Sequence, residues 1–238
     1  MSIRNGKSLA SILVAVAVVA TLLGCAEPKV IADGEPAEGV TPLCGLTKPE
    51  DLVEVPGGGW LITGEMPHLQ TESPIQGRLM AIRIADHSQQ ELFPGGLPAR
   101  GPVLGDPACP GPPESARFAP HGLDLAQLAS GRQVLVVVNH GEQERVDLFD
   151  VDLISGEPRL AWAGCVVVPT SMWPNDVVLR PDGSLVVSKM LPGPLGATGL
   201  AVGFRLLTGG NTGAVYGWSP GKGWSEFEGS QGSAPNGN

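Results

Sequence analysis

One pattern of apolar and polar residues recurs along the chain and predicts many of its strands. A proline turn is followed by one polar residue and a short apolar run. A turn that contains glycine then leads into a second apolar run. The pattern begins at Pro49, Pro120 and Pro174, and its opening residues recur at Pro235. Because the turn reverses the chain between two short strands, each copy predicts part of an antiparallel sheet.

The spacing of the copies, roughly 60 residues, fits a propeller blade of four antiparallel strands. The sequence therefore predicts an all-β fold of the β-propeller type, with about three to four blades in residues 41–238. A small open β-sheet protein is the alternative. Equivalent positions of successive blades converge on the axis of a propeller. We therefore expect the polar residues after the four prolines to meet there, namely Glu50, His121, Asn175 and Asn236.

Four stretches of the chain have patterns of apolar and polar residues that predict their secondary structure. Trp60–Thr63 and Arg78–Ile84 are expected to be paired strands, and the continuous apolar run Val134–Val138 is typical of an inner strand. Apolar and acidic residues mix along Arg145–Val151, which favours an outer strand with one polar face. Leu191–Leu207 is rich in glycine and apolar residues, and it predicts either a loop or a membrane-facing helix.

The N-terminus has the pattern of an export signal. Two basic residues precede the apolar stretch Leu9–Leu23, which is short for a membrane span and is followed by Gly24 and Cys25. This looks like the lipobox of a bacterial lipoprotein, so residues 1–24 are expected to be removed and Cys25 to be lipidated. Residues 25–40 would then be a tether to the membrane of the cell envelope. An ordinary secretory signal with an incidental cysteine is the alternative.

Composition and charge narrow the function classes. Hydrophobic residues make up 42% of the chain, which excludes wholesale disorder. The formal net charge is −9, so nucleic acid is an unfavourable partner. An acidic surface is compatible with an exported protein or with a cation-binding protein, and it does not separate the two.

Three cysteines remain beyond the lipobox. Export favours a disulfide, but three cysteines leave one over, and the sequence alone does not fix the pairing. Cys44 and Cys109 lie in stretches rich in proline and glycine, whereas Cys165 begins an apolar, strand-like run. The composition therefore favours a Cys44–Cys109 disulfide with Cys165 buried and unpaired.

Several segments together resemble the paraoxonase (arylesterase and lactonase) branch of the calcium-dependent six-bladed β-propellers, which is related to gluconolactonase and strictosidine synthase-like proteins. The ordered set spans roughly 190 residues. The carrying segments are Pro49–Leu52, Pro120–Gly122, Val136–His140 with Val146–Phe149, Pro174–Asp176 and Pro235–Gly237. A closed six-bladed ring would need further blades, so the resemblance implies that the chain is a C-terminally truncated form.

The resemblance implies two calcium sites and a pair of histidines. Glu50, Asn175 and Asn236 resemble the ligands of the catalytic calcium, while Asp51 and Asp176 resemble those of a structural calcium, which a backbone carbonyl near Leu123 would join. His121 resembles the general base, and His140 resembles its partner. Carboxylate and amide oxygens are ligands that Ca²⁺ prefers. Each residue also has a structural interpretation, because Asp and Asn are common in turns and a histidine beside glycine is common in loops.

The chemistry of such a site is hydrolysis. A bound Ca²⁺ polarises a carbonyl and stabilises the oxyanion that forms, while a neutral imidazole takes a proton from water. The leading hypothesis is a calcium-dependent hydrolase of lactones or aryl esters, small molecules whose leaving groups need little protonation. One alternative is a non-catalytic lipoprotein that binds a ligand or partner and uses Ca²⁺ structurally. Another is an inactive truncated chain.

Overall fold

The computed structural model describes residues 39–67, 76–98, 104–141, 143–193 and 199–237. The chain divides into two compact units, residues 1–44 and 45–238, and the second contains the sheets. The export signal, Cys25 and most of the tether lie outside the described residues. Lipidation and location in the cell envelope therefore remain predictions. In the part of the chain that is described, no helix is long and apolar enough to cross a membrane.

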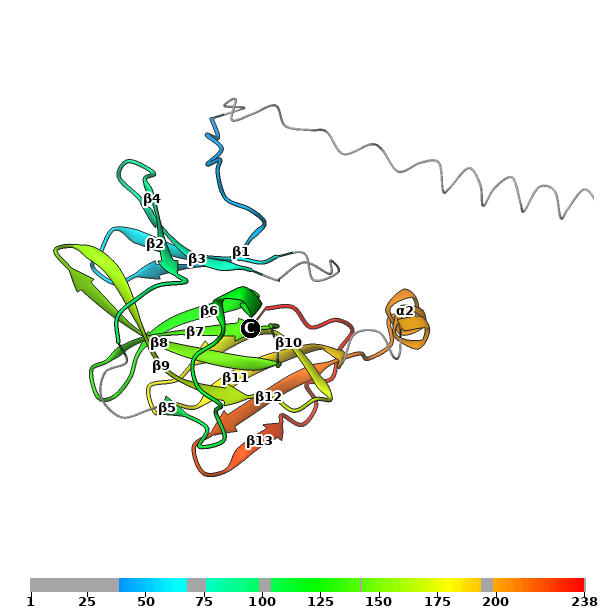
Figure 1. Ribbon diagram of the computed structural model, residues 1–238. Helices are drawn as coiled ribbons and strands as arrows, with labels where there is room; N and C mark the ends of the chain where they lie inside the picture. Colours follow the sequence, from blue (N-terminus) through cyan, green and yellow to red (C-terminus); the bar gives the residue numbers. More distant parts are fainter. Residues whose placement is uncertain (1–38, 68–75, 99–103, 142, 194–198, 238) are drawn as a thin grey trace, which may run out of the picture. The chain divides into compact units, whose positions relative to one another are not determined.

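Three successive sheets of antiparallel strands form the second unit (Figure 1). The first contains β1 (Pro49–Val55), β2 (Trp60–Glu65), β3 (Arg78–Arg83) and β4 (Gln89–Phe93). The second contains β6 (Pro120–Gln127), β7 (Gln133–Asn139), β8 (Arg145–Ile154) and β9 (Glu157–Val167), with the short β5 (Leu104–Gly105) parallel to β9. The third contains β10 (Met172–Leu179), β11 (Leu185–Pro192), β12 (Ala214–Ser219) and β13 (Gly223–Glu226).

This architecture confirms the all-β class. In each sheet the four main strands follow one another in sequence order, as the repeated pattern predicts. The expected pairing of Trp60–Thr63 with Arg78–Ile84 is confirmed in the register of β2 with β3. The sheets are open, and the number of blades in a complete propeller stays a prediction. The helical elements within the described residues are a 3₁₀ turn, Ser115–Arg117, and the helix α2, Gly199–Leu207.

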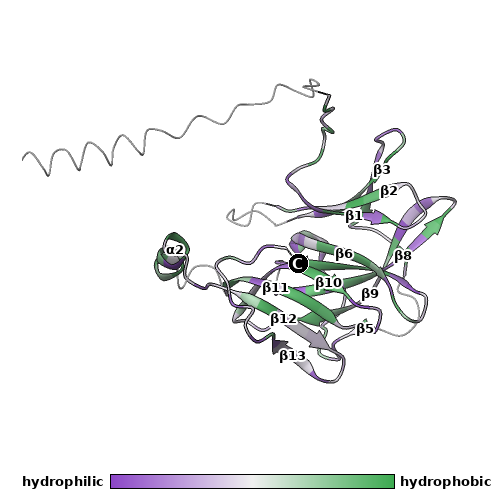
Figure 2. Ribbon diagram, turned by 180° about the vertical axis from the view of Figure 1, so that it is seen from behind, coloured by the Kyte–Doolittle hydropathy of each residue, from purple (hydrophilic) through white to green (hydrophobic). Residues whose placement is uncertain are grey.

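The second sheet is buried on both faces, which explains the continuous apolar run in β7. Leu135 and Val137 pack in one cluster with residues of the first sheet, while Val134, Val136 and Val138 pack in another with residues of the third. All five side chains are fully buried. Successive residues of a strand point to opposite faces, so a strand between two cores must be apolar at every position. In Figure 2 much of the second sheet is green, the colour of hydrophobic residues.

The outer-strand interpretation of Arg145–Val151 was wrong. β8 lies between β7 and β9, and the side chains of Asp147 and Asp150 are buried. Each carboxylate is paired with an arginine, because a buried charge must be compensated. Arg132 binds Asp150 through two hydrogen bonds of 2.9 and 2.8 Å, and Arg145 donates to Asp147 over 3.0 Å. Burial raises the pKa of Asp147, and Arg145 opposes this shift.

The disulfide joins Cys109 to Cys165, so the Cys44–Cys109 pairing was wrong. β5 pairs with β9 at Gly105 and Cys165, and the N–H of Asp106 donates to the carbonyl of Cys165 over 2.8 Å. This parallel pairing brings the loop that carries Cys109 to within a Cα–Cα distance of 5.4 Å of Cys165, which suits a disulfide. Cys44 is exposed and takes no part in this bridge.

The stretch Leu191–Leu207 contains the end of β11 and the helix α2, so its C-terminal part is a helix rather than a loop. None of the residues of α2 is buried. Leu200, Phe204 and Leu207 are strongly exposed, at 95%, 68% and 88%. The helix therefore adds little to the cores that hold the sheets together. Whether it faces a membrane stays a prediction.

Shortening Leu135 in the two-sided core should destabilise the fold. Leu135→Ala removes a fully buried side chain and leaves a cavity, so we expect the free energy of unfolding to fall by about 3 kcal/mol in urea denaturation. Leu153→Ala in β8 is the matched control, because Leu153 is 42% exposed, and we expect a change within about 1 kcal/mol. Equal losses for both variants would contradict the two-sided burial of the second sheet.

Breaking the disulfide should have a comparable effect. In the oxidised chain, Cys109→Ser opens a loop of 56 residues, so we expect the free energy of unfolding to fall by about 2–4 kcal/mol. Cys44→Ser should leave stability nearly unchanged. Peptide mapping without reduction should recover Cys109 linked to Cys165. Recovery of a Cys44–Cys109 peptide would contradict this and support the pairing expected from composition.

Candidate functional site

The repeated prolines mark the same irregularity in all three sheets. The register of the first strand with its neighbour shifts between Pro49 and Leu52, between Pro120 and Leu123, and between Pro174 and Val177. In each case two residues on the first strand lie opposite one residue on the next, which is a β-bulge. Bulges redirect side chains and are common beside functional sites. The bulged pairs are Glu50–Asp51, His121–Gly122 and Asn175–Asp176.

The prolines explain why the bulges lie in these strands. β1, β6 and β10 are edge strands of their sheets, and proline is tolerated in an edge strand or at a bulge because its missing N–H costs no ladder hydrogen bond there. Both β1 and β10 contact β6. The three bulges therefore meet around β6, and the residues after three of the four prolines come together as predicted.

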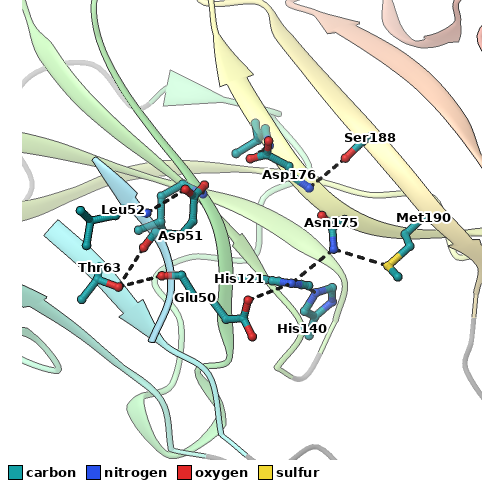
Figure 3. Close-up of polar contacts among 12 residues, drawn as sticks. Glu50, Asp51, Leu52, Thr63, His121, His140, Asn175, Asp176, Ser188 and Met190 are labelled. Carbon is teal, nitrogen blue, oxygen red and sulfur yellow. Dashed lines mark hydrogen bonds and ion pairs between the residues drawn. The ribbon is translucent and has the colours of Figure 1, made fainter. Parts of the chain in front are cut away.

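Glu50, His121 and Asn175 form the centre of the candidate site (Figure 3). Nε2 of His121 is 3.7 Å from Oε2 of Glu50 and 3.3 Å from Nδ2 of Asn175. The Asn175 side-chain nitrogen also lies 3.5 Å from the sulfur of Met190 in β11. Asn175 is buried and the side chain of His121 is 14% exposed, whereas that of Glu50 is 43% exposed. The site is thus shielded behind His121 and open beside Glu50.

The two histidines are in direct contact. Nδ1 of His121 is 3.0 Å from Nε2 of His140, which follows the last residue of β7. The His140 ring is stacked on Trp173, with ring centroids 4.5 Å apart and an interplanar angle of 19°. The predicted pairing of His121 with His140 is therefore present in the geometry. Trp173 supports this pair, a role that sequence analysis did not anticipate.

Electrostatics keep His121 neutral. Burial is the main cause that lowers its pKa to about 4, and the neighbouring His140 lowers it further, while Asp51 acts in the opposite direction. At neutral pH the imidazole is therefore unprotonated, and a general base must be unprotonated to accept a proton.

His140 has a second polar partner, Glu144, in the loop between β7 and β8. Nδ1 of His140 is 2.6 Å from Oε2 of Glu144. The side chain of His140 is 1% exposed and that of Glu144 is 25% exposed. Sequence analysis missed Glu144 because it lies outside the repeated pattern. Its distance of four residues from His140 was the only available signal.

The second predicted metal pair lies around Gly122 and Leu123. Oδ2 of Asp51 accepts from the N–H of Leu123 over 2.8 Å, so the structure presents an amide here rather than the carbonyl that a metal would need. On the other side, a Cβ added to Gly122 would lie 2.8 Å from Oδ1 of Asp176 and would clash with the carbonyl oxygen of Asn175. Asp51 and Asp176 therefore both lie close to the same short stretch of β6.

Asn236, the fourth residue of the predicted axial set, is exposed. Its neighbour Gly237 lies near Asp176, because a Cβ on Gly237 would be 4.0 Å from Oδ2 of that residue. The start of the fourth copy thus lies close to Asp176 in β10. Among the described residues, no hydrogen bond or ion pair joins Asn236 to Glu50, His121 or Asn175.

The predicted calcium ligands are of the kind that a hard cation prefers, but they are too few to complete its coordination shell. Within the described ranges, no group of three or more His, Cys, Asp or Glu side chains is arranged to hold a metal ion. The predicted calcium sets, however, combine carboxylates with amide oxygens. Ca²⁺ takes six to eight oxygen ligands, so Glu50, Asn175 and Asn236 would need water or further groups to complete the shell.

No protein-family model matches the chain, and no curated protein matches it. A solved structure of a proposed 6-phosphogluconolactonase from Bacteroides fragilis matches with 17% identity and a TM-score of 0.39, over 79% of this chain and 40% of that one. One from Bacteroides uniformis matches with 13% identity and a TM-score of 0.33, over 82% and 60%.

The chain therefore spans less than two thirds of either of these structures. Similarities this low do not place the chain in a family, and the lactonase description belongs to those two proteins. The resemblance to paraoxonase-like propellers remains an inference from the sequence.

The close approach at Gly122 should not tolerate a side chain. A Cβ in Gly122→Ala would lie 2.5 Å from the Cα of Asp176, so β6 and β10 would have to separate. Overpacking of this kind costs about 1–3 kcal/mol, and we expect that loss in urea denaturation. Gly203→Ala in α2 is the control. No atom lies within 4 Å of its added Cβ, so stability should stay the same or rise slightly. A Gly122→Ala variant as stable as the control would contradict the packing.

Proposed function

We propose that this chain is part of a hydrolase of lactones or aryl esters that depends on calcium, in a propeller of the paraoxonase-like type. The observation that carries the proposal is the contact between His121 and His140 at a bulge shared with Glu50 and Asn175. A neutral, largely buried imidazole whose Nε2 lies beside a carboxylate and an amide is a suitable base for activating water.

His121 acts as the general base in this proposal. A water molecule beside Nε2 gives up a proton to His121 as its oxygen attacks the carbonyl carbon of the ester or lactone. His140 holds the His121 ring through the 3.0 Å contact, and Trp173 keeps the His140 ring in place by stacking. The shielding of His121 limits competing hydrogen bonds with bulk water.

Glu50 and Asn175, with Asn236 from the fourth copy, would hold the calcium ion. When bound, Ca²⁺ supplies positive charge that polarises the substrate carbonyl and stabilises the oxyanion. Asp51 and Asp176 would serve a second, structural calcium. Because both carboxylates lie close to Gly122 and Leu123, such an ion would fix the position of β6 relative to its neighbours.

The substrate class follows from the leaving group. The described site has no acid other than Glu50 near Nε2 of His121, so a substrate whose leaving group needs little protonation is favoured. Aryl esters meet this requirement through their phenolate leaving group, whereas the alcohol of an opened lactone would take back the proton that His121 has accepted. The proposed location is the cell envelope, with the chain anchored through a lipid on Cys25.

The test is hydrolysis by the full chain with and without calcium. We expect turnover of phenyl acetate or of γ- and δ-lactones, loss of that turnover with a chelator, and recovery with Ca²⁺. His121→Asn should lower kcat by about 10²–10⁴-fold, since it removes the base. His87→Asn is the matched control, because His87 is exposed at a positive φ of 60°, which asparagine tolerates.

Two results would contradict the proposal. One is the absence of calcium-dependent turnover across the panel. The other is a His121→Asn variant as active as His87→Asn. In the first case, a calcium-dependent rise in melting temperature would instead favour a binding protein that uses Ca²⁺ structurally.

A further inference from the structure

The proposed function uses His121 and His140 but not Glu144, which contacts His140. Oε2 of Glu144 is 2.6 Å from Nδ1 of His140, which is the only ring nitrogen of His140 not facing His121. The backbone of Glu144 is itself held, because its carbonyl accepts from the N–H of Val168 over 3.0 Å. The carboxylate is therefore presented from a fixed position in the loop between β7 and β8.

With Glu144 ionised and both rings neutral, the donors and acceptors along this chain of contacts fit together in one way. An ionised carboxylate only accepts hydrogen bonds, so Nδ1 of His140 must carry the proton. In a neutral ring Nε2 of His140 is then an acceptor, and Nδ1 of His121 must donate to it. Nε2 of His121 is left with its lone pair, and Asn175 donates to it over 3.3 Å, as an acceptor there requires.

We propose that Glu144 is a positioning residue that fixes the tautomer and orientation of His140 and thereby leaves Nε2 of His121 as the base of the site. The tautomer assignment stands on geometry alone, while its catalytic consequence rests on the proposed function. Three contacts then hold His140, with Glu144 at Nδ1, His121 at Nε2 and Trp173 against the ring face.

This arrangement also gives the proton a balanced route. An O–H bond of water breaks as an N–H bond forms at Nε2 of His121. The Nδ1–H bond of His121 breaks as an N–H bond forms at Nε2 of His140. His121 ends neutral, and His140 becomes a cation with protons on both nitrogens. That cation lies next to the Glu144 carboxylate, which stays ionised and stabilises it. The proton returns by the reverse path to the departing alcohol or phenol.

The experiment compares Glu144→Gln with the unchanged chain, using two independent measurements. The first is the ring ¹⁵N and ¹H NMR spectrum of ¹⁵N-histidine-labelled protein, which reports the tautomer of each ring without requiring activity. We expect His140 to be protonated at Nδ1 in the unchanged chain. A glutamine amide can donate or accept, so Glu144→Gln should give a mixture of tautomers. An unchanged NMR pattern in Glu144→Gln would overturn the proposal.

The second measurement is steady-state kinetics. We expect Glu144→Gln to lower kcat about a hundredfold with little change in KM, because a misplaced tautomer affects proton transfer more than binding. Glu144→Asp keeps a carboxylate and should recover part of the loss in kcat. If the glutamine variant does not fold, Glu144→Asp is compared with the unchanged chain in its place. Glu157→Gln is the matched control, because Glu157 is a carboxylate outside the site that is bound to another side chain, that of Arg159, over 2.9 Å.

The outcomes separate the two proposals. If the unchanged chain hydrolyses none of the substrates, the proposed function fails, and the NMR comparison still decides whether Glu144 sets the tautomer. If the chain is active and Glu144→Gln loses no more kcat than Glu157→Gln, the positioning role of Glu144 is overturned while the hydrolase proposal stands.

Discussion

The close packing of β6 against β10 at Gly122 is the constraint on which the candidate site depends. Gly122 lies so near the backbone of Asn175 and Asp176 that no side chain fits between them. This approach places His121, the residue before Gly122, beside Asn175, the residue before Asp176. A bulge at the same position in each strand turns these neighbouring residues toward one another. The site is therefore mainly a consequence of backbone packing between sheets, and the loop after β7 contributes His140 and Glu144.

Two-sided burial of the second sheet keeps that packing in place. Its strands contribute to both apolar clusters, so the sheet is held against the first and third sheets at the same time. Such a sheet cannot keep a polar face toward water, and its buried carboxylates need partners within the protein. Asp147 illustrates this, because Arg145, Asn139 and Trp162 all donate to it over distances of 2.8–3.1 Å.

The sequence predicted those features that depend on local pattern. The proline, polar and glycine spacing predicted the strands, and repetition predicted that Glu50, His121 and Asn175 would meet. It could not predict features that depend on distant pairing. The bridge from Cys109 to Cys165 follows from the parallel contact of β5 with β9, which no local pattern encodes. The burial of Asp147 was missed because alternation of polar and apolar residues looks the same in a half-exposed strand and in a strand with buried ion pairs. Glu144 was missed because its contact with His140 depends on the course of a single turn.

The buried network around Asp147 links this core to the histidine pair. Oδ1 of Asn139 accepts from the N–H of Ala119 and from that of Gly141, both over 3.0 Å. Ala119 is two residues before His121, and Gly141 directly follows His140, so one side chain holds the backbone near both histidines. The amide of Asn139 is in turn fixed by Asp147. Fully satisfied buried networks rigidify their surroundings. The fold itself therefore holds His121 and His140 in their 3.0 Å contact, which would lower the reorganisation that the proposed proton transfer requires.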